Sequence, residues 1–280
     1  MTAGGDRRRG RLLVAVALVA VAALAPALVA GRPANQVPVE TVARSQAESL
    51  SRPTGSAWND TVPVDVPLSS APSSVPNASE TSTEQVKVRA ARTEDRLFVR
   101  LHWRDATDDG NLSQSPYEAP KVDSFADAAA VQLPVNTSVR PGIAMGSTRE
   151  MVNVWYWNPD EGSQELLAAG PGTTTRFRNA SVETAAAYRD DQWYVVYSRP
   201  LVVDGANRTE IRTENDVSVA FAVWNGSNME RSGRKSVSEW HTFPLGPGPA
   251  GPPYEALLWT VAGIAIVVVV VVTAQAVRET

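Results

Sequence analysis

Cysteine is absent from the 280 residues of this chain, and histidine is scarce. Without cysteine there is no disulfide, no thiolate zinc site, no iron–sulfur cluster and no covalent c-type haem, which needs Cys-x-x-Cys-His. The two histidines, His102 and His241, are too few for a metal site built on several imidazoles. A strong charge of one sign is also missing, because the net charge is −4, so a nucleic-acid partner has no electrostatic support.

Long apolar runs are few, and the two that occur set the expected topology. The first, residues 12–29, follows an arginine-rich start, so residues 1–30 are interpreted as a signal peptide cleaved near Ala25-Pro26-Ala27 or as an uncleaved anchor. The second run predicts a transmembrane helix over residues 256–277, because it can span a bilayer core of roughly 30 Å. Arginines at both outer ends predict that these ends are cytoplasmic and that the middle of the chain is extracytoplasmic.

Asn-x-Ser/Thr sequons are confined to that middle part, which fits an exported and glycosylated domain. A Ser/Thr/Asn-rich surface without glycans would give the same pattern. The seven sequons begin at Asn59, Asn77, Asn111, Asn136, Asn179, Asn207 and Asn225.

Short runs with alternating polarity fill the middle of the chain and predict strands. Residues 86–91 and 96–103 are typical of a hairpin that turns at Glu94-Asp95, and many such turn-bounded runs favour an antiparallel β-sandwich. We therefore expect a mainly β protein with its sandwich over residues 54–246. Residues 31–53 are interpreted as a polar tether, and residues 247–255 as a stiff Pro/Gly linker.

The stretch from Val217 to Leu245 departs most clearly from a plain hairpin. An apolar strand ends at the turn dipeptide Asn225-Gly226, and a basic Ser/Gly-rich loop precedes a second strand. The loop carries Arg231, Arg234 and Lys235. A loop of this length between two apolar strands predicts that it presents a side chain for function.

Several runs of this chain together resemble one known family. These runs are AARTEDRLFVRLHWRDAT (90–107), FADAAAVQLPV (125–135), PGIAMGSTREMVNVWYW (141–157), WYVVYSRPL (193–201) and VAFAVWNGSNMERSGRKSVSEW (219–240). They are similar to the haem b-binding gamma subunits of type II dimethyl-sulfoxide-reductase-family molybdoenzymes. That family includes the gamma subunits of ethylbenzene dehydrogenase, dimethylsulfide dehydrogenase, and chlorate and selenate reductases. The resemblance covers most of residues 54–245.

The resemblance implies a cofactor and its ligands. In the family a Met and a Lys are the axial ligands of one non-covalent haem b, and the matching positions here are Met145 and Lys235. A thioether is a soft ligand that favours reduced iron, and the lysine must bind as a neutral amine. Arg231 and Arg234 would disfavour the ammonium form of Lys235, and they could pair with the haem propionates.

Other interpretations of the same residues stay open at the level of sequence. Met is usually core filler, and Lys235 could belong to a solvated basic turn. His102 and His241 are the rival ligands in a His/Met pair, although a structural role suits each histidine. The acidic residues Asp105, Asp108, Asp109 and Asp123 lack the EF-hand spacing, so a solvated acidic loop is the expectation there.

Two functions follow from these patterns. The first is a membrane-anchored, extracytoplasmic electron-transfer subunit of a respiratory oxidoreductase, with no catalytic residues of its own. Its implied partners are a molybdopterin catalytic subunit, an iron–sulfur subunit and a membrane or periplasmic electron carrier. The second is an extracellular carbohydrate-binding module, in which some of the eight Trp residues would stack on sugars. Trp103, Trp193 and Trp224 argue against the module, because their strand positions are typical of core side chains.

Overall fold

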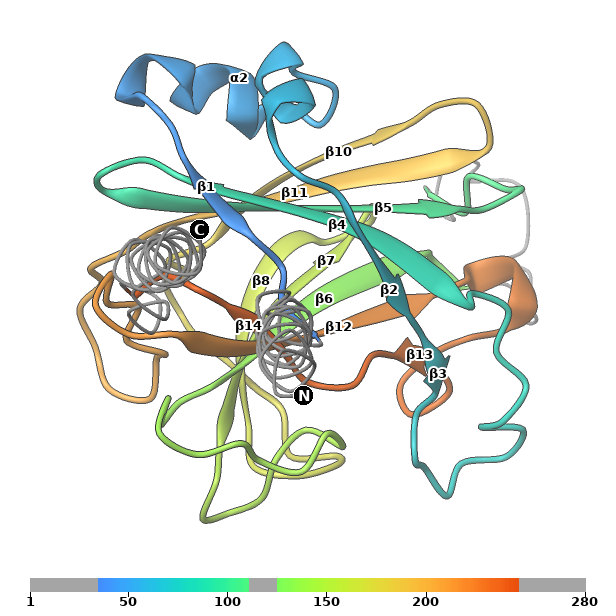
Figure 1. Ribbon diagram of the computed structural model, residues 1–280. Coiled ribbons are helices and arrows are strands. Elements are labelled where there is room, and N and C mark those ends of the chain that lie inside the picture. The colour runs from blue at the N-terminus through green and yellow to red at the C-terminus, as the bar shows by residue number, and fades with distance from the viewer. Residues whose placement is uncertain (1–34, 111–124, 247–280) are drawn as a thin grey trace, which may run out of the picture. The chain divides into compact units, whose positions relative to one another are not determined.

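Two sheets lie face to face in the computed structural model, which describes residues 35–110 and 125–246 (Figure 1). This arrangement confirms the prediction of a mainly β sandwich. The predicted signal or anchor segment, the Pro/Gly linker and the C-terminal membrane helix lie outside the described residues. Within the described ranges, no helix is long and apolar enough to cross a membrane.

The first sheet has six strands in the order β1-β4-β5-β11-β10, with β2 also paired to β4. Its strands are β1 (Val39–Thr41), β2 (Val64–Pro67), β4 (Gln85–Arg92), β5 (Arg96–Arg104), β10 (Glu183–Tyr188) and β11 (Gln192–Pro200). All pairs are antiparallel except β1 with β4. The hairpin predicted at Glu94-Asp95 is confirmed, since β4 and β5 pair with Arg92 opposite Leu97.

The second sheet has eight strands in the order β3-β13-β12-β6-β7-β8-β9, with β14 also paired to β12. Its strands are β3 (Ser69–Ser70), β6 (Ala128–Pro134), β7 (Val152–Asn158), β8 (Gly162–Ala168), β9 (Thr175–Arg176), β12 (Val217–Trp224), β13 (Ser236–Val237) and β14 (His241–Phe243). The Asn225 side chain caps the short 3-10 helix η4 (Gly226–Asn228), so the predicted turn is one helical turn rather than a two-residue turn.

The main core lies between the sheets and is built from alternate residues of each strand. On β12, Val217, Val219, Phe221 and Val223 all contribute to it, as the period of two in a strand requires. The partner sheet contributes large side chains such as Trp103. The residues between these positions face outward, so each sheet also has an outer face whose cover decides its use.

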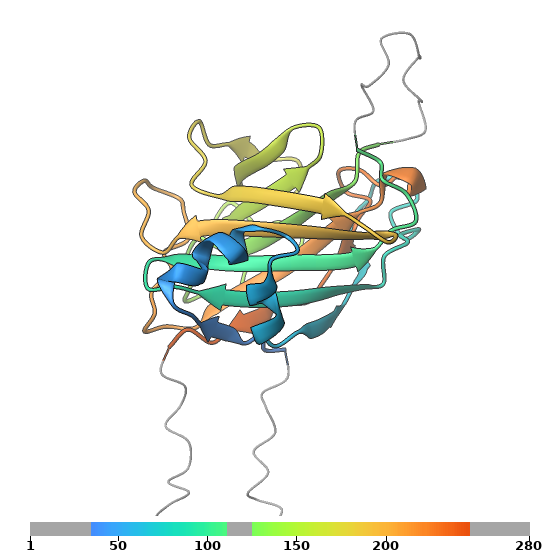
Figure 2. The ribbon, with the colours of Figure 1, turned by 90° about the horizontal axis from the view of Figure 1, so that it is seen from above.

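Short helices cover the outer face of the six-stranded sheet (Figure 2). They are η2 (Arg44–Gln46), α2 (Ala47–Ser51) and η3 (Ser56–Asp60). Trp58 and Leu50 pack there against Phe98 and Val196 in a separate buried cluster. The predicted boundary at residue 54 falls inside the compact unit Asn35–Pro247, because the segment treated as a tether supplies β1 and α2.

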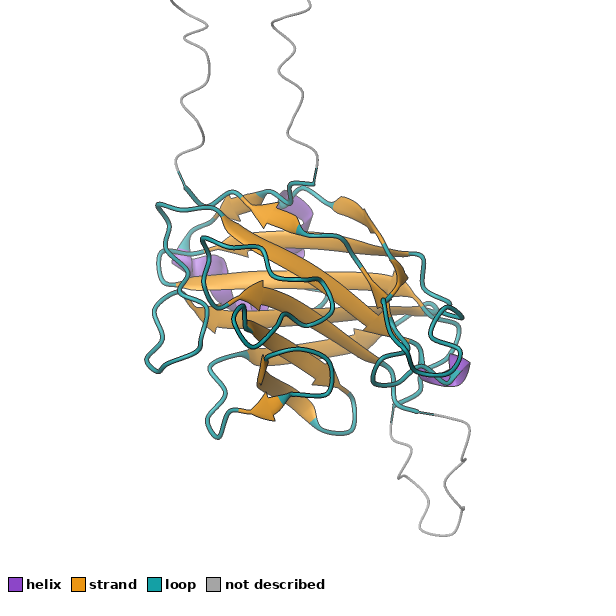
Figure 3. Ribbon diagram, turned by 90° about the horizontal axis from the view of Figure 1, so that it is seen from below, coloured by secondary structure: helices purple, strands orange, loops and turns teal. Residues whose placement is uncertain are grey.

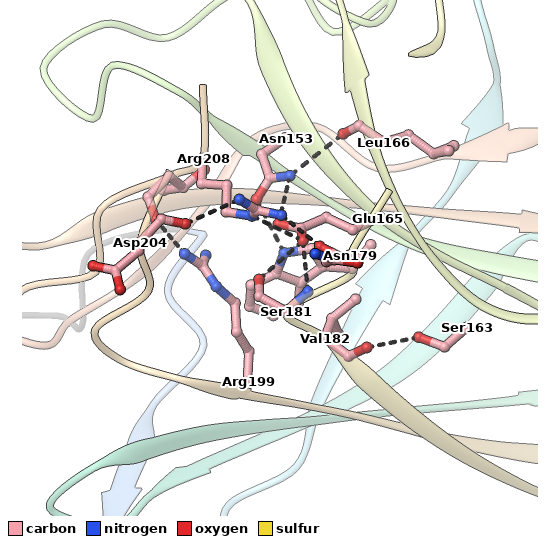
Figure 4. A network of polar contacts seen from close by, with 12 residues as sticks. Asn153, Ser163, Glu165, Leu166, Asn179, Ser181, Val182, Arg199, Asp204 and Arg208 are labelled. Atoms are coloured by element: carbon pink, nitrogen blue, oxygen red, sulfur yellow. Dashed lines mark hydrogen bonds and ion pairs between the residues drawn. The ribbon is translucent and has the colours of Figure 1, made fainter. Parts of the chain in front are cut away.

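A buried carboxylate on β8, next to the β9 edge strand of the second sheet, binds the neighbouring loops (Figure 4). Glu165 is fully buried and accepts hydrogen bonds from Ser181 N (2.7 Å), Asn153 Nδ2 (3.2 Å) and Arg208 Nε (3.1 Å). Burial favours a higher pKa for Glu165, but the hydrogen bonds from Ser181 and Arg208 outweigh it and lower the pKa. The carboxylate is therefore charged and satisfied, which holds the loops around residues 181 and 208 on this edge.

Candidate functional site

A cavity of about 1020 Å³ lies on the outer face of the eight-stranded sheet. Its floor comes from β6, β7 and β12, where Ala128, Val154 and Trp224 belong to an outward-facing apolar cluster. Loops from four parts of the chain cross this face and form the walls; Figure 3 shows loops passing over the strands. The walls come from residues 71–75, 143–145, 171, 172, 174, 230–233 and 235. The volume lies at the upper end of the usual range of about 300–1,000 Å³ for ligand sites.

Met145 lies in the loop between β6 and β7 and lines this cavity. Its backbone has a positive φ of 67°, and Gly146 follows with a φ of 72°. A non-glycine residue in the left-handed region is uncommon and is held by its surroundings. Here Gly170 N donates to Met145 O at 2.9 Å, which joins this loop to the loop after β8. The side chain is half-buried against the outer-face cluster, so the expectation of a turn residue is confirmed.

Lys235 directly precedes β13 and also lines the cavity. Its carbonyl oxygen accepts a hydrogen bond from Ala71 N at 2.9 Å, which fixes its backbone beside β3. The side chain is only 8% exposed, although lysine is rarely buried without a partner. A solvated basic turn is therefore excluded for Lys235.

The two side chains meet inside the cavity. Lys235 Nζ lies 3.6 Å from Met145 Sδ and 5.0 Å from the ring centre of Trp224. No carboxylate forms an ion pair with Lys235 in the described part of the chain. Burial lowers the pKa of Lys235 to about 8, so its neutral form is much more accessible than in a solvated lysine. The pair offers a soft sulfur atom and an amine that readily loses its proton, which are two suitable ligands for a transition metal.

The two arginines of the loop lie in different places. Arg231 lines the cavity, and its guanidinium lies 4.4 Å from the ring centre of Phe125, which lines the same cavity. Arg234 does not line the cavity; its Nε and Nη2 donate to the carbonyl oxygen of Glu80 at 3.0 and 2.8 Å. Only Arg231 is thus placed to meet an anionic group of a ligand in the cavity.

The rival histidines do not line the cavity. His102 on β5 stacks on Tyr194 with a ring-centre distance of 4.2 Å and contacts Gln192. His241 on β14 is buried, and its Nδ1 lies 3.0 Å from Glu239 O. Each histidine has a structural environment, as the sequence indicated.

Aromatic side chains near the cavity were not predicted as site residues. Trp224 was expected in the core, but it lies on the outer face, packs edge-on against Tyr156 at 5.6 Å and lines the cavity. The expectation is confirmed for Trp103 and Trp193, which lie between the sheets. The alternation along β12 could have predicted this position. Val223 faces the core, so the next residue, Trp224, must face the opposite side of the sheet.

The cavity fits a porphyrin in its chemistry as well as in its volume. Apolar and aromatic side chains line the floor, the two ligand-type atoms converge, and Arg231 supplies a cation at the wall. A cysteine-free chain can hold a haem only without thioether bonds to the protein. The loops that form the cavity walls converge on a sheet face.

The fold and its cavity define a β-sandwich protein with a large cavity on the outer face of one sheet. The family described as ethylbenzene dehydrogenase matches residues 55–181 and 170–236. The chain therefore belongs to the ethylbenzene dehydrogenase family, the group of molybdoenzyme gamma subunits that the sequence motifs predicted.

Relatives with assigned names extend this comparison. A Haloferax mediterranei protein named "Putative respiratory nitrate reductase heme subunit ORF7" is 57% identical over 268 residues, or 95% of this chain and 94% of that protein. The chlorate reductase subunit gamma of Ideonella dechloratans is 34% identical over 67% of this chain and 77% of its own length. The dimethylsulfide dehydrogenase subunit gamma of Rhodovulum sulfidophilum is 37% identical over 55% of this chain and 58% of its own length.

Solved structures are much more distant. A "putative carbohydrate-binding protein" from Bacteroides uniformis is 11% identical, with a TM-score of 0.43 over 78% of this chain and 93% of that chain. A family 9 carbohydrate-binding module from Caldicellulosiruptor kristjanssonii in complex with glucose is 10% identical, with a TM-score of 0.33 over 65% of this chain and 75% of that chain. These scores are too low to support a shared function.

Proposed function

We propose that this chain is the haem-binding electron-transfer subunit of a respiratory molybdoenzyme complex. It holds one haem b without covalent attachment, with Met145 and Lys235 as the two axial ligands. The observation that carries the proposal is the approach of Met145 Sδ to within 3.6 Å of Lys235 Nζ inside an apolar cavity. These atoms come from residues 90 positions apart in sequence.

The environment of each ligand suits its role. The thioether of Met145 is neutral and soft, and it favours the reduced state of a bound iron. Lys235 must lose a proton before its nitrogen can bind, and burial already lowers its pKa to about 8. Arg231 would meet a propionate at the cavity wall, whereas Arg234 is held by Glu80. A bound haem would supply one-electron chemistry. The protein would supply the iron ligands, an apolar cavity wall and the positive charge of Arg231.

The names of the relatives support the choice of complex. They describe a nitrate reductase haem subunit, a chlorate reductase subunit and a dimethylsulfide dehydrogenase subunit. By this comparison the chain works with a molybdopterin catalytic subunit and an iron–sulfur subunit. The substrate belongs to the catalytic partner, and a nitrate or related oxyanion is the substrate class that the 57% identical relative favours.

The location is part of the same proposal. The arginine-flanked apolar runs favour a sandwich held outside the cytoplasm by a C-terminal membrane helix. Five of the sequon asparagines are exposed, namely Asn59, Asn77, Asn136, Asn179 and Asn207. Asn225 is half-buried and caps η4, so a glycan does not fit there. Protease added to intact cells should cleave the sandwich domain; full protection of its exposed loops would contradict this location.

The ligand pair is tested by spectroscopy of four variants of the full chain. Lys235→Ala and Met145→Ala should each convert a six-coordinate low-spin haem into a high-spin or water-ligated one, and Met145→Ala should also lower the midpoint potential. His102→Ala and His241→Ala are the matched controls and should keep the low-spin spectrum, because neither side chain lines the cavity. Visible absorption and electron paramagnetic resonance report the spin state directly.

Two outcomes would contradict the proposal. If a histidine variant loses the low-spin signature while Lys235→Ala keeps it, a His/Met pair holds the iron instead. If the purified full chain has no Soret band, takes up no added haem and binds glycans, the carbohydrate-binding alternative replaces this proposal. Acid–acetone should extract all of the haem, and pigment that stays with the polypeptide would contradict non-covalent binding.

A further inference from the structure

Three aspartates gather at a point distinct from the lining of the cavity. Asp105 follows β5, Asp109 lies in the loop after it, and Asp127 directly precedes β6. Each offers a carboxylate oxygen that lies within 4.8 Å of the other two. The sequence favoured a solvated acidic loop here, and that interpretation is wrong for Asp105, which is only 3% exposed. Asp108 is exposed as expected, and Asp123 lies outside the described residues.

The cluster carries negative charge that no basic side chain neutralises. None of the ion pairs in the described ranges includes Asp105, Asp109 or Asp127. Asp127 is fully buried, and Oδ2 of Asp105 is buried and forms no hydrogen bond of normal geometry, although the donor Trp103 Nε1, which also forms none, is nearby. A buried carboxylate oxygen without a well-formed hydrogen bond is costly, and a bound cation would satisfy it.

We propose that Asp105, Asp109 and Asp127 bind one divalent, oxygen-preferring cation, for which Ca²⁺ is the suitable probe. Ca²⁺ takes oxygen ligands at about 2.3–2.6 Å, so two oxygens on one ion lie at most about 5.2 Å apart. The spacing of the three carboxylates is within that limit. Thr107 Oγ1 lies 3.3 Å from Asp105 Oδ1 and 2.8 Å from Asp109 Oδ2, which adds a neutral oxygen to the same place.

The carboxylates are already held in position by donors around the cluster. Asp127 Oδ1 accepts from Gly226 N at 2.9 Å, and its Oδ2 accepts from Trp193 Nε1 at 2.9 Å and from Asp109 N at 3.0 Å. Asp109 Oδ2 accepts from Ser227 N at 2.7 Å. Such outer contacts orient ligands. Asp127 Oδ2 and Asp109 Oδ2 each already accept two hydrogen bonds, whereas Asp127 Oδ1 accepts one, from Gly226 N, and keeps a lone pair for an ion.

The cluster braces one wall of the cavity. Phe125 N donates to Gly226 O at 3.3 Å, and a side chain at Gly226 would lie 1.6 Å from Phe125 O, so only glycine allows this close approach. Phe125 lines the cavity, and the loop after Gly226 leads to Lys235. A bound cation would therefore fix the wall that carries Phe125. Any effect of the cation on haem retention rests on the proposed function, whereas cation binding itself does not.

The test is a calorimetric titration of CaCl₂ into the chelator-treated full chain, with thermal unfolding followed by circular dichroism. We expect one Ca²⁺ per chain and a higher Tm in Ca²⁺ than in EDTA. Asp105→Asn and Asp127→Asn should each weaken binding by about tenfold or more, because a charged ligand is lost. Asp108→Asn is the matched control, since it removes an exposed carboxylate of the same loop, and it should bind Ca²⁺ like the wild type.

The order of the Tm values of the wild type and Asp105→Asn should reverse between EDTA and Ca²⁺. This reversal distinguishes a cation site from an acidic cluster that binds no ion. In EDTA, Asp105→Asn should unfold at or above the wild-type Tm, because repulsion between buried carboxylates is relieved, whereas in Ca²⁺ the wild type should be the more stable protein. Absence of both binding heat and a Ca²⁺-dependent Tm in the wild type would overturn the proposal, even if a variant fails to fold. Neither readout uses haem absorbance. The outcome of this test can therefore be told apart from a failure of the haem proposal.

Discussion

The two sheets bury apolar side chains on their outer faces in opposite ways. On the six-stranded sheet, Trp58 and Leu50 from the short helices press onto Phe98 and are completely buried. On the eight-stranded sheet, the covering segments are loops, and the floor beneath them includes the small residues Ala128 and Ala130. One face is thus closed by the protein itself, and the other keeps a cavity of about 1020 Å³.

The comparison teaches that side-chain size on the face and in its cover decides whether a sheet face becomes core or binding site. A large aromatic side chain such as Trp58 stabilises the fold directly, because it buries apolar surface against the sheet. Alanines on a floor forgo that gain and leave room for a flat ligand, whose binding then returns stability through mass action. The first face should therefore respond to mutation in stability, and the second in ligand binding.

Removal of the Trp58 side chain should have the largest effect on stability. Trp58 is fully buried, its Nε1 donates to Arg52 O at 3.1 Å, and the Arg100 guanidinium lies 5.0 Å from its ring centre. Trp58→Ala should lower the free energy of unfolding by about 3–5 kcal/mol, as in other large-to-small core substitutions. Denaturant unfolding of the full chain measures the loss. Val202→Ala, at a side chain that is 85% exposed, should change stability by less than about 0.5 kcal/mol.

Filling the floor of the cavity should make the second face resemble the first. Ala128 is buried and lines the cavity, so Ala128→Phe places a ring where the proposed haem would lie. We expect haem affinity to fall about 100-fold, equivalent to about 2.7 kcal/mol, while the far-ultraviolet circular dichroism stays unchanged. Ala186→Phe, on the exposed side of β10, is the control and should bind haem normally. Equal haem affinity in the two variants would show that this floor is not the binding surface.

The pH dependence of haem uptake should follow Lys235. Burial lowers its pKa to about 8, and below that value the folded chain must release one proton before the nitrogen can bind. Affinity should therefore rise about tenfold for each pH unit up to about 8 and then level off. Glu230 and Arg231 also line the cavity, so the Lys235→Ala variant is needed to assign the pH dependence to Lys235. Titration of the haem-free protein from pH 6 to 9 measures the slope; Lys235→Ala should bind more weakly and lose it, and an unchanged slope in that variant would contradict the role of Lys235.

The smallest expected effect separates the two arginines. Arg231→Gln removes an exposed cation that would pair with a haem propionate, which corresponds to about 0.2–1 kcal/mol, or up to about a fivefold loss of haem affinity. Arg234→Gln should leave haem affinity unchanged, since the Arg234 guanidinium binds the Glu80 carbonyl outside the cavity. Parallel titrations would measure both; a larger loss in Arg234→Gln would reverse the assignment.

Much of the fold was predictable because alternation reports which side of a strand is buried. β5, β7, β11 and β12 all appear where the polarity alternates, with core residues at every second position. β8 escaped prediction because its sequence GSQELLA has few β-branched residues and places Glu165 in the interior. β1 escaped because a three-residue parallel strand has no periodic signal, so residues 31–53 were interpreted as a tether.

The family motif named Met145 and Lys235, and the structure brings their side chains together in one cavity, while their role as ligands stays a prediction. The place of this cavity was not predictable. Nothing in their local sequence shows that the meeting point is a sheet face, since that depends on which loops fold back over β6 and β12. The burial of Asp105 was missed for the same reason, because its cover comes from Asp127 and Asn225 far along the chain.

The wall of the cavity also determines when in the life of the protein the site exists. Ala71 and Lys235 meet through a hydrogen bond although 164 positions separate them, and Met145 reaches the same cavity from the middle of the chain. Contacts so distant in sequence form late in folding. A nascent chain that stops before Lys235 carries only one of the two side chains that converge in the cavity. Under the proposed function, haem loading would therefore follow synthesis of the whole domain.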